Sequence, residues 1–381
     1  MPGPDSNSWD PLNFVTQTVF ERVDWMGVSK KMGAGKIRSR EMILSDANQN
    51  VIMRAVRIQS SKGQEPYSAS NPAPSSALVL ERDVPVPELK PGQVLVRVHA
   101  TTVTRDELTW PESYHHELRI PGYDFSGVVE KVCEEGRFKP RDEVYAMVST
   151  KRGSTWAEYA MVEEDELALK PKNLSWAEGV TVPLNALTAW QALFVQAGVP
   201  EPDFDAAAKV STGRTLLVTG SSGAVGSYIV QLAVFAGLQV VAASSSTERN
   251  DAFLRSLGAH EVVEYDELSI VKRSFDIVID TVGGKPLAQA WDLVTDAGSL
   301  ISVDSSSFNF AKTPPAGKEH VKAVFFIVEP SGKQLGKLAK ALEMEYVRPF
   351  LAETFLLDEA KEAYERANGR MDKRGKVVLK L

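Results

Sequence analysis

The sequence is poor in cysteine and lacks long apolar runs, and each shortage excludes a class of protein. Cys133 is the only cysteine among 381 residues, which excludes an internal disulfide framework and any multi-cysteine zinc or iron–sulfur site. No apolar run approaches the roughly 18 residues that a transmembrane helix needs. Acidic residues outnumber basic ones by 50 to 43, and the resulting charge of −7 provides no general attraction for nucleic acid.

The remaining composition is typical of a globular protein. Apolar residues make up 43% of the chain and charged residues 24%, which excludes a wholly disordered or fibrous protein. The length predicts about two domains. We therefore expect a partner that is a small-molecule substrate, neither nucleic acid nor a membrane, and a reducing compartment, which we take to be the cytoplasm.

The first part of the chain, residues 1 to 52, differs from the rest and is predicted to be a poorly ordered N-terminal extension. Apolar residues at helical spacing, from Leu12 to Met26, are followed by a basic run from Lys30 to Arg40. A mitochondrial presequence is the alternative interpretation, but acidic residues precede the basic run, unlike most presequences. Met53 is a natural beginning for the compact fold.

Two patterns of predicted secondary structure follow along the chain. Residues 53 to 180 contain short β-branched or alternating segments punctuated by proline and glycine, which predicts a small, loop-rich β domain. Residues 181 to 345 alternate strands with helices, which indicates a parallel, doubly wound sheet. A helix from Glu359 to Ala367 and a strand from Lys376 to Leu381 end the chain.

A glycine-rich turn carries the chemistry. The apolar strand from Thr215 to Thr219 leads into a G-x-x-G-x-x-G pattern, and a helix is predicted from Val225 to Ala236. The first glycine allows a sharp turn, the second a close approach of backbone to a pyrophosphate, and the third close packing of the helix. The spacing excludes a P-loop and a nucleophile elbow. The predicted cofactor contacts are Gly220, Ser221, Ser222, Gly223, Ala224, Val225 and Gly226.

The end of the next strand distinguishes between the two nicotinamide cofactors. An acidic residue at this point, about 20 residues after the first glycine, is typical of NAD-binding sheets. Here Ser244 and Ser245 end the strand, with Arg249 shortly after them. Hydroxyls and a guanidinium suit a 2′-phosphate, so the sequence favours NADPH. Glu248 leaves NAD open as the alternative.

These features resemble the medium-chain dehydrogenase/reductase superfamily, in particular its zinc-independent quinone oxidoreductase-like and enoyl reductase-like branch. The likeness spans residues 53 to 381 and, through Thr104–Trp110, is similar to the reticulon-interacting mitochondrial NADPH oxidoreductase type. The resemblance implies an α/β fold in which a GroES-like β domain (53–180 and 346–381) encloses a doubly wound parallel Rossmann sheet (181–345). Besides the glycine turn, the matching stretches are Pro85–Val98, Ile120–Gly127, Ala157–Ala160 and Val182–Trp190.

This chain differs from zinc-dependent relatives at positions that bear on metal binding. Those relatives carry a cysteine in the segment matching Thr101–Asp106 and a His-Glu pair where this chain has Tyr123 and Asp124. We therefore predict no metal site. Without a Lewis acid the reduction of a plain ketone is difficult, whereas a quinone or an α,β-unsaturated carbonyl spreads the developing charge. Tyr123 is the predicted catalytic hydroxyl, although its ring equally suits a filler of the cleft.

Further contacts are implied by the resemblance, position by position. Thr188 matches a threonine near the nicotinamide, and Tyr265 a tyrosine at the adenosine phosphate end. Val282 and Gly283 follow a predicted strand and should line the carboxyl edge of the sheet. Phe326 and the segment Lys373–Lys376 match late nucleotide-facing positions. Relatives also suggest a homodimer paired through the strand Val321–Ile327.

Two other functions stay open. The chain suits a trans-acting enoyl-thioester reductase of polyketide or fatty-acid metabolism, for which a basic patch at the cleft mouth would be the sign. It also suits an NADPH-binding scaffold or sensor without turnover, because fold alone does not decide activity.

Overall fold

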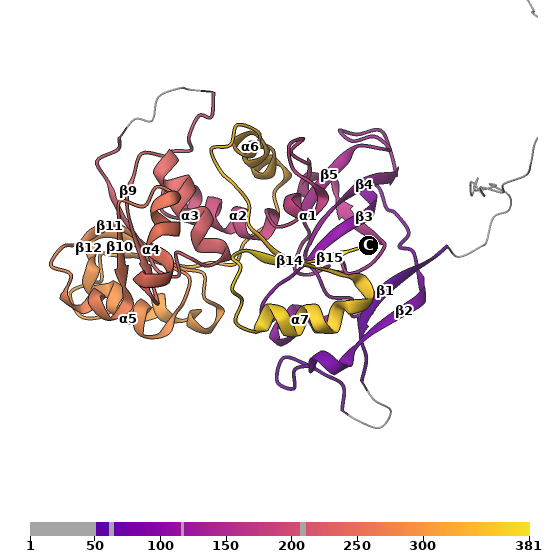
Figure 1. Ribbon diagram of the computed structural model, residues 1–381, viewed down its shortest axis with the longest axis horizontal. Helices are drawn as coiled ribbons and strands as arrows, with labels where there is room; N and C mark the ends of the chain where they lie inside the picture. Colours follow the sequence, from indigo (N-terminus) through magenta and orange to yellow (C-terminus); the bar gives the residue numbers. More distant parts are fainter. Residues whose placement is uncertain (1–50, 61–64, 116–117, 206–210) are drawn as a thin grey trace, which may run out of the picture. The chain divides into compact units, whose positions relative to one another are not determined.

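The computed structural model describes residues 51–60, 65–115, 118–205 and 211–381 (Figure 1). The N-terminal extension, with its apolar residues at helical spacing and its basic run, lies outside these residues. Strand β1 (Ile52–Ile58) begins one residue before the predicted start of the compact fold and pairs antiparallel with β2 (Leu78–Pro85). The β texture of this part of the sequence thus begins where it was predicted to begin.

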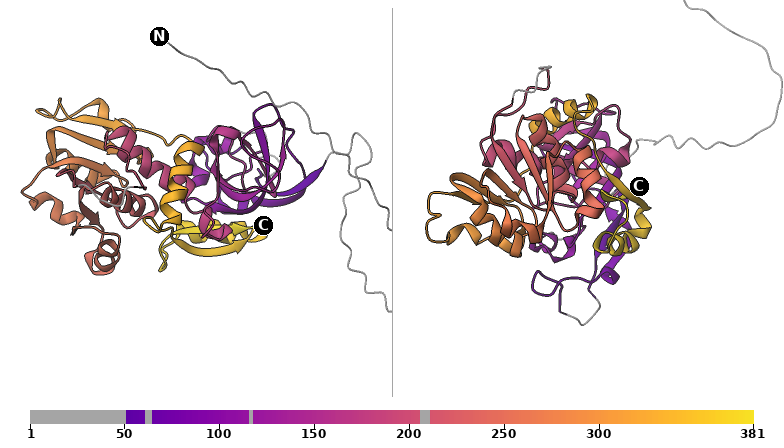
Figure 2. Two further views of the ribbon diagram at one scale, coloured as in Figure 1. Left: turned by 90° about the horizontal axis from the view of Figure 1, so that it is seen from above. Right: turned by 60° about the vertical axis from the view of Figure 1, so that its left-hand side comes forward.

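The larger sheet of the β domain combines strands from both ends of the described chain. The C-terminal strand β15 runs antiparallel to β3, and β14 runs parallel to β15, so the last segment closes this domain (Figures 1 and 2). Valines at alternate positions of β3 pack on Phe125 in a shared core. The order is β14 (Leu351–Leu356), β15 (Lys376–Lys380), β3 (Gln93–Val103), β4 (Asp124–Val132), β5 (Glu143–Met147) and β7 (Leu167–Leu169), with β6 (Tyr159–Glu163) on β3.

The second sheet is parallel, and its central strands are buried on both faces, as apolar strands such as Thr215–Val218 require. The chain enters this sheet at the central strand Thr215–Val218, adds the next two strands on one side and the last three on the other side. This is the doubly wound arrangement of dinucleotide-binding sheets. The predicted fold class, α/β with a GroES-like β domain and a Rossmann sheet, is confirmed. The order is β10 (Glu261–Glu264), β9 (Gln239–Ser244), β8 (Thr215–Val218), β11 (Phe275–Asp280), β12 (Val294–Ser302) and β13 (Lys322–Phe325).

Helices flank these sheets at nearly the predicted positions. The helix that begins at Pro183 is α-helical only to Trp190 and continues as a π-helical turn over Gln191–Gln196. The helices are α1 (Trp176–Gly179), α2 (Pro183–Trp190), α3 (Ala224–Phe235), α4 (Thr247–Ser256), α5 (Gly284–Leu293), α6 (Gly332–Glu343) and α7 (Ala360–Asn368).

The main apolar core lies between α2, α3 and α6 and the adjoining face of the parallel sheet. Trp190, Leu193 and Leu216 are fully buried in it. Within the described residues, no helix combines the length and apolarity needed to cross a bilayer.

Candidate functional site

The glycine turn has the geometry that its spacing predicts. Gly220 has φ +64°, and a side chain there would overlap the hydroxyl of Thr281. A side chain on Gly226 would overlap the carbonyl oxygen of Gly220, so α3 lies directly against the turn. The Gly223 N–H donates to the Gly220 carbonyl at 2.9 Å, and Gly223 is the N-cap of α3. The three glycines therefore form one compact turn.

The head of α3 is suited to bind an anion. The helix begins at Ala224, and the amides of its first turn have no carbonyl partner within the helix. Those amides and the helix dipole favour a negatively charged group just before Ala224. Ser222 is partly exposed here and Gly223 is exposed. Ser221 is buried and its hydroxyl donates to the Ala243 carbonyl at 2.8 Å, so it fastens the turn to β9.

The end of β9 separates a structural serine from exposed groups. Ser244 is fully buried, and its hydroxyl accepts from the Asn250 side chain at 3.1 Å and donates to the Ser246 carbonyl at 3.1 Å. Ser245 and Arg249 are exposed. The Ser244 hydroxyl is thus occupied by the β9–α4 turn, while Ser245 and Arg249 have side chains free to meet a ligand.

Two neighbouring turns meet the glycine turn along the carboxyl edge of the sheet. The Tyr265 hydroxyl accepts the Gly220 N–H at 3.1 Å. Buried Asp280, at the end of β11, accepts from Thr219, from the Gly283 N–H at 2.9 Å and from Ser302. Burial raises the pKa of Asp280, and these donors oppose the rise. Asp280 therefore holds the Val282–Gly283 turn against β8.

The C-terminal segment contributes two cations. A cavity beside the glycine turn is lined by Ser222, Gly223, Tyr228, Arg374 and Lys376, among others. Arg374 donates to the Arg249 carbonyl at 2.7 Å and lies over the Phe253 ring, 4.2 Å from its centroid. Burial, and then the charge of Arg249, lowers the pKa of Arg374. The Arg374 guanidinium thus lines the cavity at the head of α3 and feels the charge of Arg249, and an anion bound between them would relieve that repulsion.

Backbone geometry fixes this placement. Gly375 has φ +115°, and a side chain on it would overlap the carbonyl oxygen of Phe350. The Lys376 N–H donates to the same Phe350 carbonyl at 3.0 Å. Only glycine suits this position.

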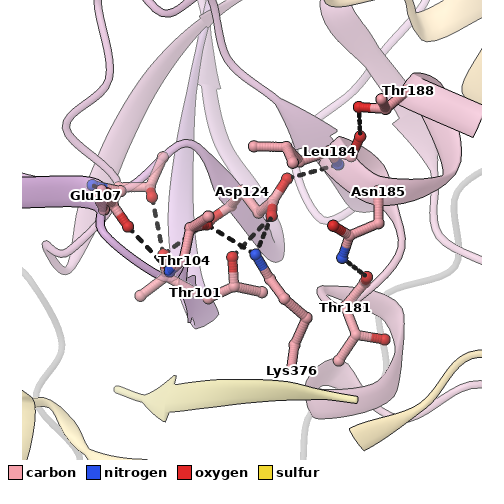
Figure 3. Close-up of polar contacts among 12 residues, drawn as sticks. Thr101, Thr104, Glu107, Asp124, Thr181, Leu184, Asn185, Thr188 and Lys376 are labelled. Atoms are coloured by element: carbon pink, nitrogen blue, oxygen red, sulfur yellow. Dashed lines mark hydrogen bonds and ion pairs between the residues drawn. The ribbon is translucent and has the colours of Figure 1, made fainter. Parts of the chain in front are cut away.

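Lys376 also belongs to a buried polar network (Figure 3). Its ammonium donates to the Thr104 hydroxyl at 2.7 Å and lies 3.9 Å from an oxygen of Asp124. Asp124 accepts from the Thr102 hydroxyl at 2.7 Å and from the Leu184 N–H at 2.8 Å. Burial raises the pKa of Asp124 and lowers that of Lys376, and each opposes the shift of the other.

Tyr123 lies beside this network and is almost completely buried, with 2% of its surface exposed. Its ring is tilted against that of Trp110, with the centroids 5.5 Å apart. Its hydroxyl is 3.4 Å from the Ser113 hydroxyl, which donates to the Glu107 carbonyl at 2.8 Å. Because Ser113 has one hydrogen, Tyr123 is the donor in their contact. Burial raises the pKa of Tyr123, so its hydroxyl stays protonated at neutral pH.

Two predicted contacts are more enclosed. Thr188 is 5% exposed, and its hydroxyl donates to the Leu184 carbonyl at 2.6 Å, one turn back in α2. Phe326 packs partly buried against the main core. Tyr228 was not anticipated: its hydroxyl is buried and, within the part of the chain that the structure describes, makes no hydrogen bond of ordinary geometry. A buried hydroxyl on the cavity wall is costly unless a ligand satisfies it.

Comparison with known proteins agrees with this geometry. A family model described as alcohol dehydrogenase GroES-like domain matches residues 90–172, and one described as zinc-binding dehydrogenase matches residues 257–379. A probable zinc-binding oxidoreductase, mitochondrial, from Arthroderma benhamiae is 38% identical over 82% of this chain and 96% of its own. The chain belongs to the medium-chain dehydrogenase/reductase superfamily.

Other superfamily members are similar over most of the chain. The NADPH-dependent alkenal/one oxidoreductase, chloroplastic, of Arabidopsis thaliana is 33% identical over 71% of this chain and 67% of its own. The NAD(P)H oxidoreductase RTN4IP1, mitochondrial, of Danio rerio is 28% identical over 76% and 84%. The solved quinone oxidoreductase from Coxiella burnetii covers 86% of this chain and 99% of its own, at 26% identity and a TM-score of 0.72. The chain is therefore an oxidoreductase of a superfamily that binds NAD(P)H.

The described residues offer few side chains suited to bind zinc, the metal that one family description names. Among the described residues, no group of three or more His, Cys, Asp or Glu side chains is arranged to hold a metal ion. At the positions where zinc-dependent superfamily members have a histidine and a glutamate, this chain has Tyr123, in contact with Trp110, and Asp124, paired with Lys376. The side chains present here do not fit the nitrogen and sulfur donor sets that zinc prefers.

Proposed function

We propose that this protein is an NADPH-dependent oxidoreductase that transfers hydride, without a metal ion, to a quinone or an α,β-unsaturated carbonyl compound. The observation that carries the proposal is the cavity that Arg374 lines together with the glycine turn and the head of α3, with Arg374 bonded to the backbone of Arg249. The residues present fit a dinucleotide: the turn offers amides to a pyrophosphate, and the two arginines offer charge to a further phosphate.

The preference for NADPH rests on the surroundings of β9. A carboxylate that binds ribose hydroxyls would repel a 2′-phosphate, whereas guanidinium groups bind it through charge-assisted hydrogen bonds. Glu248, the acid that left NAD open, is exposed in the first turn of α4. Glu264, which pairs with Ser244 across β9 and β10, accepts from the Thr247 N–H and hydroxyl at 2.6 and 2.9 Å. It is therefore occupied by the start of α4. The name of the Arabidopsis relative, which includes NADPH, agrees with this preference.

The acceptor is inferred from the chemistry around Tyr123. A bound nicotinamide supplies hydride from its C4 position. In place of a Lewis acid, the site offers a protonated phenol on Tyr123 and a wall formed by Trp110. A phenol donates a hydrogen bond to a carbonyl oxygen as negative charge develops there. An acceptor whose charge is delocalised needs no stronger stabilisation, which favours quinones and enones over plain ketones.

One experiment tests both the class of acceptor and the independence of the reaction from a metal ion. Purified protein is incubated with NADPH and a panel of quinones, enones and saturated ketones, and nicotinamide absorbance is followed before and after exhaustive chelation. We expect turnover with quinones or enones that chelation leaves unchanged, and none with saturated ketones. Loss of activity on chelation and recovery with zinc would contradict the metal-free assignment.

Two results of this experiment favour the other functions. Tight NADPH binding without turnover on any acceptor favours a scaffold or sensor. Turnover restricted to thioesters on a phosphopantetheine carrier favours the enoyl-thioester reductase.

We assign residues 53–180 and 346–381 to the substrate domain and residues 181–345 to the dinucleotide domain.

Strand β13 is the last strand of the parallel sheet on its side, and Ile327 just beyond it is 55% exposed, which supports pairing in a homodimer. Two relatives have "mitochondrial" in their names, which favours the mitochondrial alternative over the cytoplasm.

A further inference from the structure

Three charged side chains are buried together below the cavity. Glu107 and Asp124 have no exposed surface, and Lys376 is 6% exposed. They come from separate segments: a short 3-10 helix (Glu107–Thr109), β4 and β15. The cluster holds two carboxylates but one ammonium, so it carries an uncompensated negative charge when all three groups are ionised. A buried charge without a counter-ion is costly.

The two acids differ in how well they are compensated. Asp124 is paired with Lys376 and accepts two further hydrogen bonds. Glu107 accepts from the N–H groups of Thr104, at 3.0 Å, and Gly122, at 2.5 Å. Within the described residues no cation lies within 4 Å of the Glu107 carboxylate, and Thr104 separates it from Lys376. Burial raises the pKa of Glu107 to about 7, against these hydrogen bonds and the charge of Lys376.

Lys376 connects this cluster to the proposed nucleotide site. It lines the same cavity as Ser222 and Gly223. A phosphate beside the glycine turn is a third anion close to the same ammonium, and its charge disfavours a second ionised acid nearby. We propose that binding of the dinucleotide transfers a proton from solution to the Glu107 carboxylate, which returns it when the nucleotide leaves. This inference rests on the proposed dinucleotide site.

Within the part of the chain that the structure describes, few titratable groups face Glu107. Lys376 faces it from β15, Asp124 from β4, Tyr123 from the segment before β4 and Tyr364 from α7. Burial raises the pKa of both tyrosines, so neither exchanges a proton near pH 7. Lys376, whose pKa burial lowers, is the rival group for the proton.

Calorimetric titration with NADPH measures the proton directly. The binding enthalpy is determined at pH 7.5 in buffers of different ionisation enthalpy, and its slope gives the protons taken up. At this pH a phosphate monoester, with its second pKa near 6, is almost fully ionised and contributes little. We expect an uptake of about 0.2 to 0.7 proton per nucleotide. The dissociation constant should rise with pH between 7 and 8.5 by the corresponding slope.

Variants identify the group. Glu107→Gln should lower the uptake to near zero, whereas Glu88→Gln, an exposed control on the β domain, should leave it unchanged. Lys376→Arg keeps a permanent charge and should retain uptake even if binding is weaker. Uptake below about 0.1 proton in the wild type, full uptake in Glu107→Gln, or its loss in Lys376→Arg would overturn the proposal. Should Glu107→Gln fail to fold, the wild type and Lys376→Arg still decide. Absence of any NADPH binding would instead refute the dinucleotide site itself.

Discussion

At the scale of single residues, the site depends on where a side chain is absent as much as on where one is present. Gly226 lies so close to the Gly220 carbonyl that a methyl group has no room, whereas the helical Gly336 in α6 faces open space. The two positions therefore make a matched pair.

We predict that Gly226→Ala lowers NADPH affinity at least about tenfold, because the turn must open to admit the methyl group. Gly336→Ala should leave affinity unchanged and stabilise the protein by about 0.5–1 kcal/mol, since alanine favours a helix interior over glycine. Fluorescence titration and urea unfolding check both. Equal affinity of Gly226→Ala and wild type would contradict the assigned role of the turn.

The Tyr123 hydroxyl makes a single long contact in the structure, so its removal should disturb chemistry more than stability. We predict that Tyr123→Phe lowers kcat about a hundredfold, with little change in KM and in the urea midpoint. Steady-state kinetics with the best enone or quinone provides the measurement. An unchanged kcat would show that the ring only fills the cleft.

At the scale of elements, the ends of strands position the loops that meet the ligand. Asp280, at the carboxyl end of β11, ties down the Val282–Gly283 turn, and Asp276, at the opposite end of that strand, accepts from Thr215. Both carboxylates hold a neighbouring segment of the chain in place, but only Asp280 lies at the edge of the sheet where we propose that the nucleotide binds.

We predict that Asp280→Asn destabilises the protein by about 1–3 kcal/mol through loss of buried acceptors and also weakens NADPH binding severalfold. Asp276→Asn should affect stability alone. Unfolding curves and nucleotide titrations separate the two effects. Equal affinity losses in both variants would show that loop position is not the cause.

The sequence predicted elements well where a signal is local. The strand, glycine turn and helix from Thr215 to Phe235 follow from apolar periodicity and three glycines. Helix α4 begins at Thr247 because the Ser246 hydroxyl accepts the Arg249 N–H and caps it. An N-cap serine was present in the sequence, but three consecutive serines concealed which one caps the helix.

The contacts that the sequence did not predict join segments far apart in the chain. Lys373–Lys376 resembled a nucleotide-facing segment, but the contact of Arg374 with Arg249, 125 residues away, depends on tertiary structure. The burial of Glu107 was equally hidden, since an acid in a polar run is usually solvated. Ser244 shows the reverse, because a predicted ligand has its hydroxyl committed to a turn.

At the scale of the whole molecule, the buried acid cluster should make stability depend on pH. Burial raises the pKa of Glu107 from 4.5 to about 7 in the folded state. Between these values the folded protein holds a proton that the unfolded chain has released, so this group destabilises the fold increasingly as pH rises.

We therefore predict that the free energy of unfolding falls between pH 5 and pH 8, by up to about 3 kcal/mol from this group. The fall should be smaller in Glu107→Gln, which has no proton to lose. Urea unfolding at several pH values tests this. A parallel pH dependence of the two proteins would show that Glu107 titrates normally.

We propose that a phosphorylated dinucleotide lies across the glycine turn with Arg249 and Arg374 at its 2′-phosphate. The most direct measurement is the dissociation constant of NADPH and of NADH, for the wild type and for the Arg249→Ala, Arg374→Ala double variant. We predict that the wild type prefers NADPH at least about tenfold and that the double variant loses this preference while keeping its NADH affinity. Equal affinity of the wild type for both nucleotides, or failure to bind either, would contradict the account.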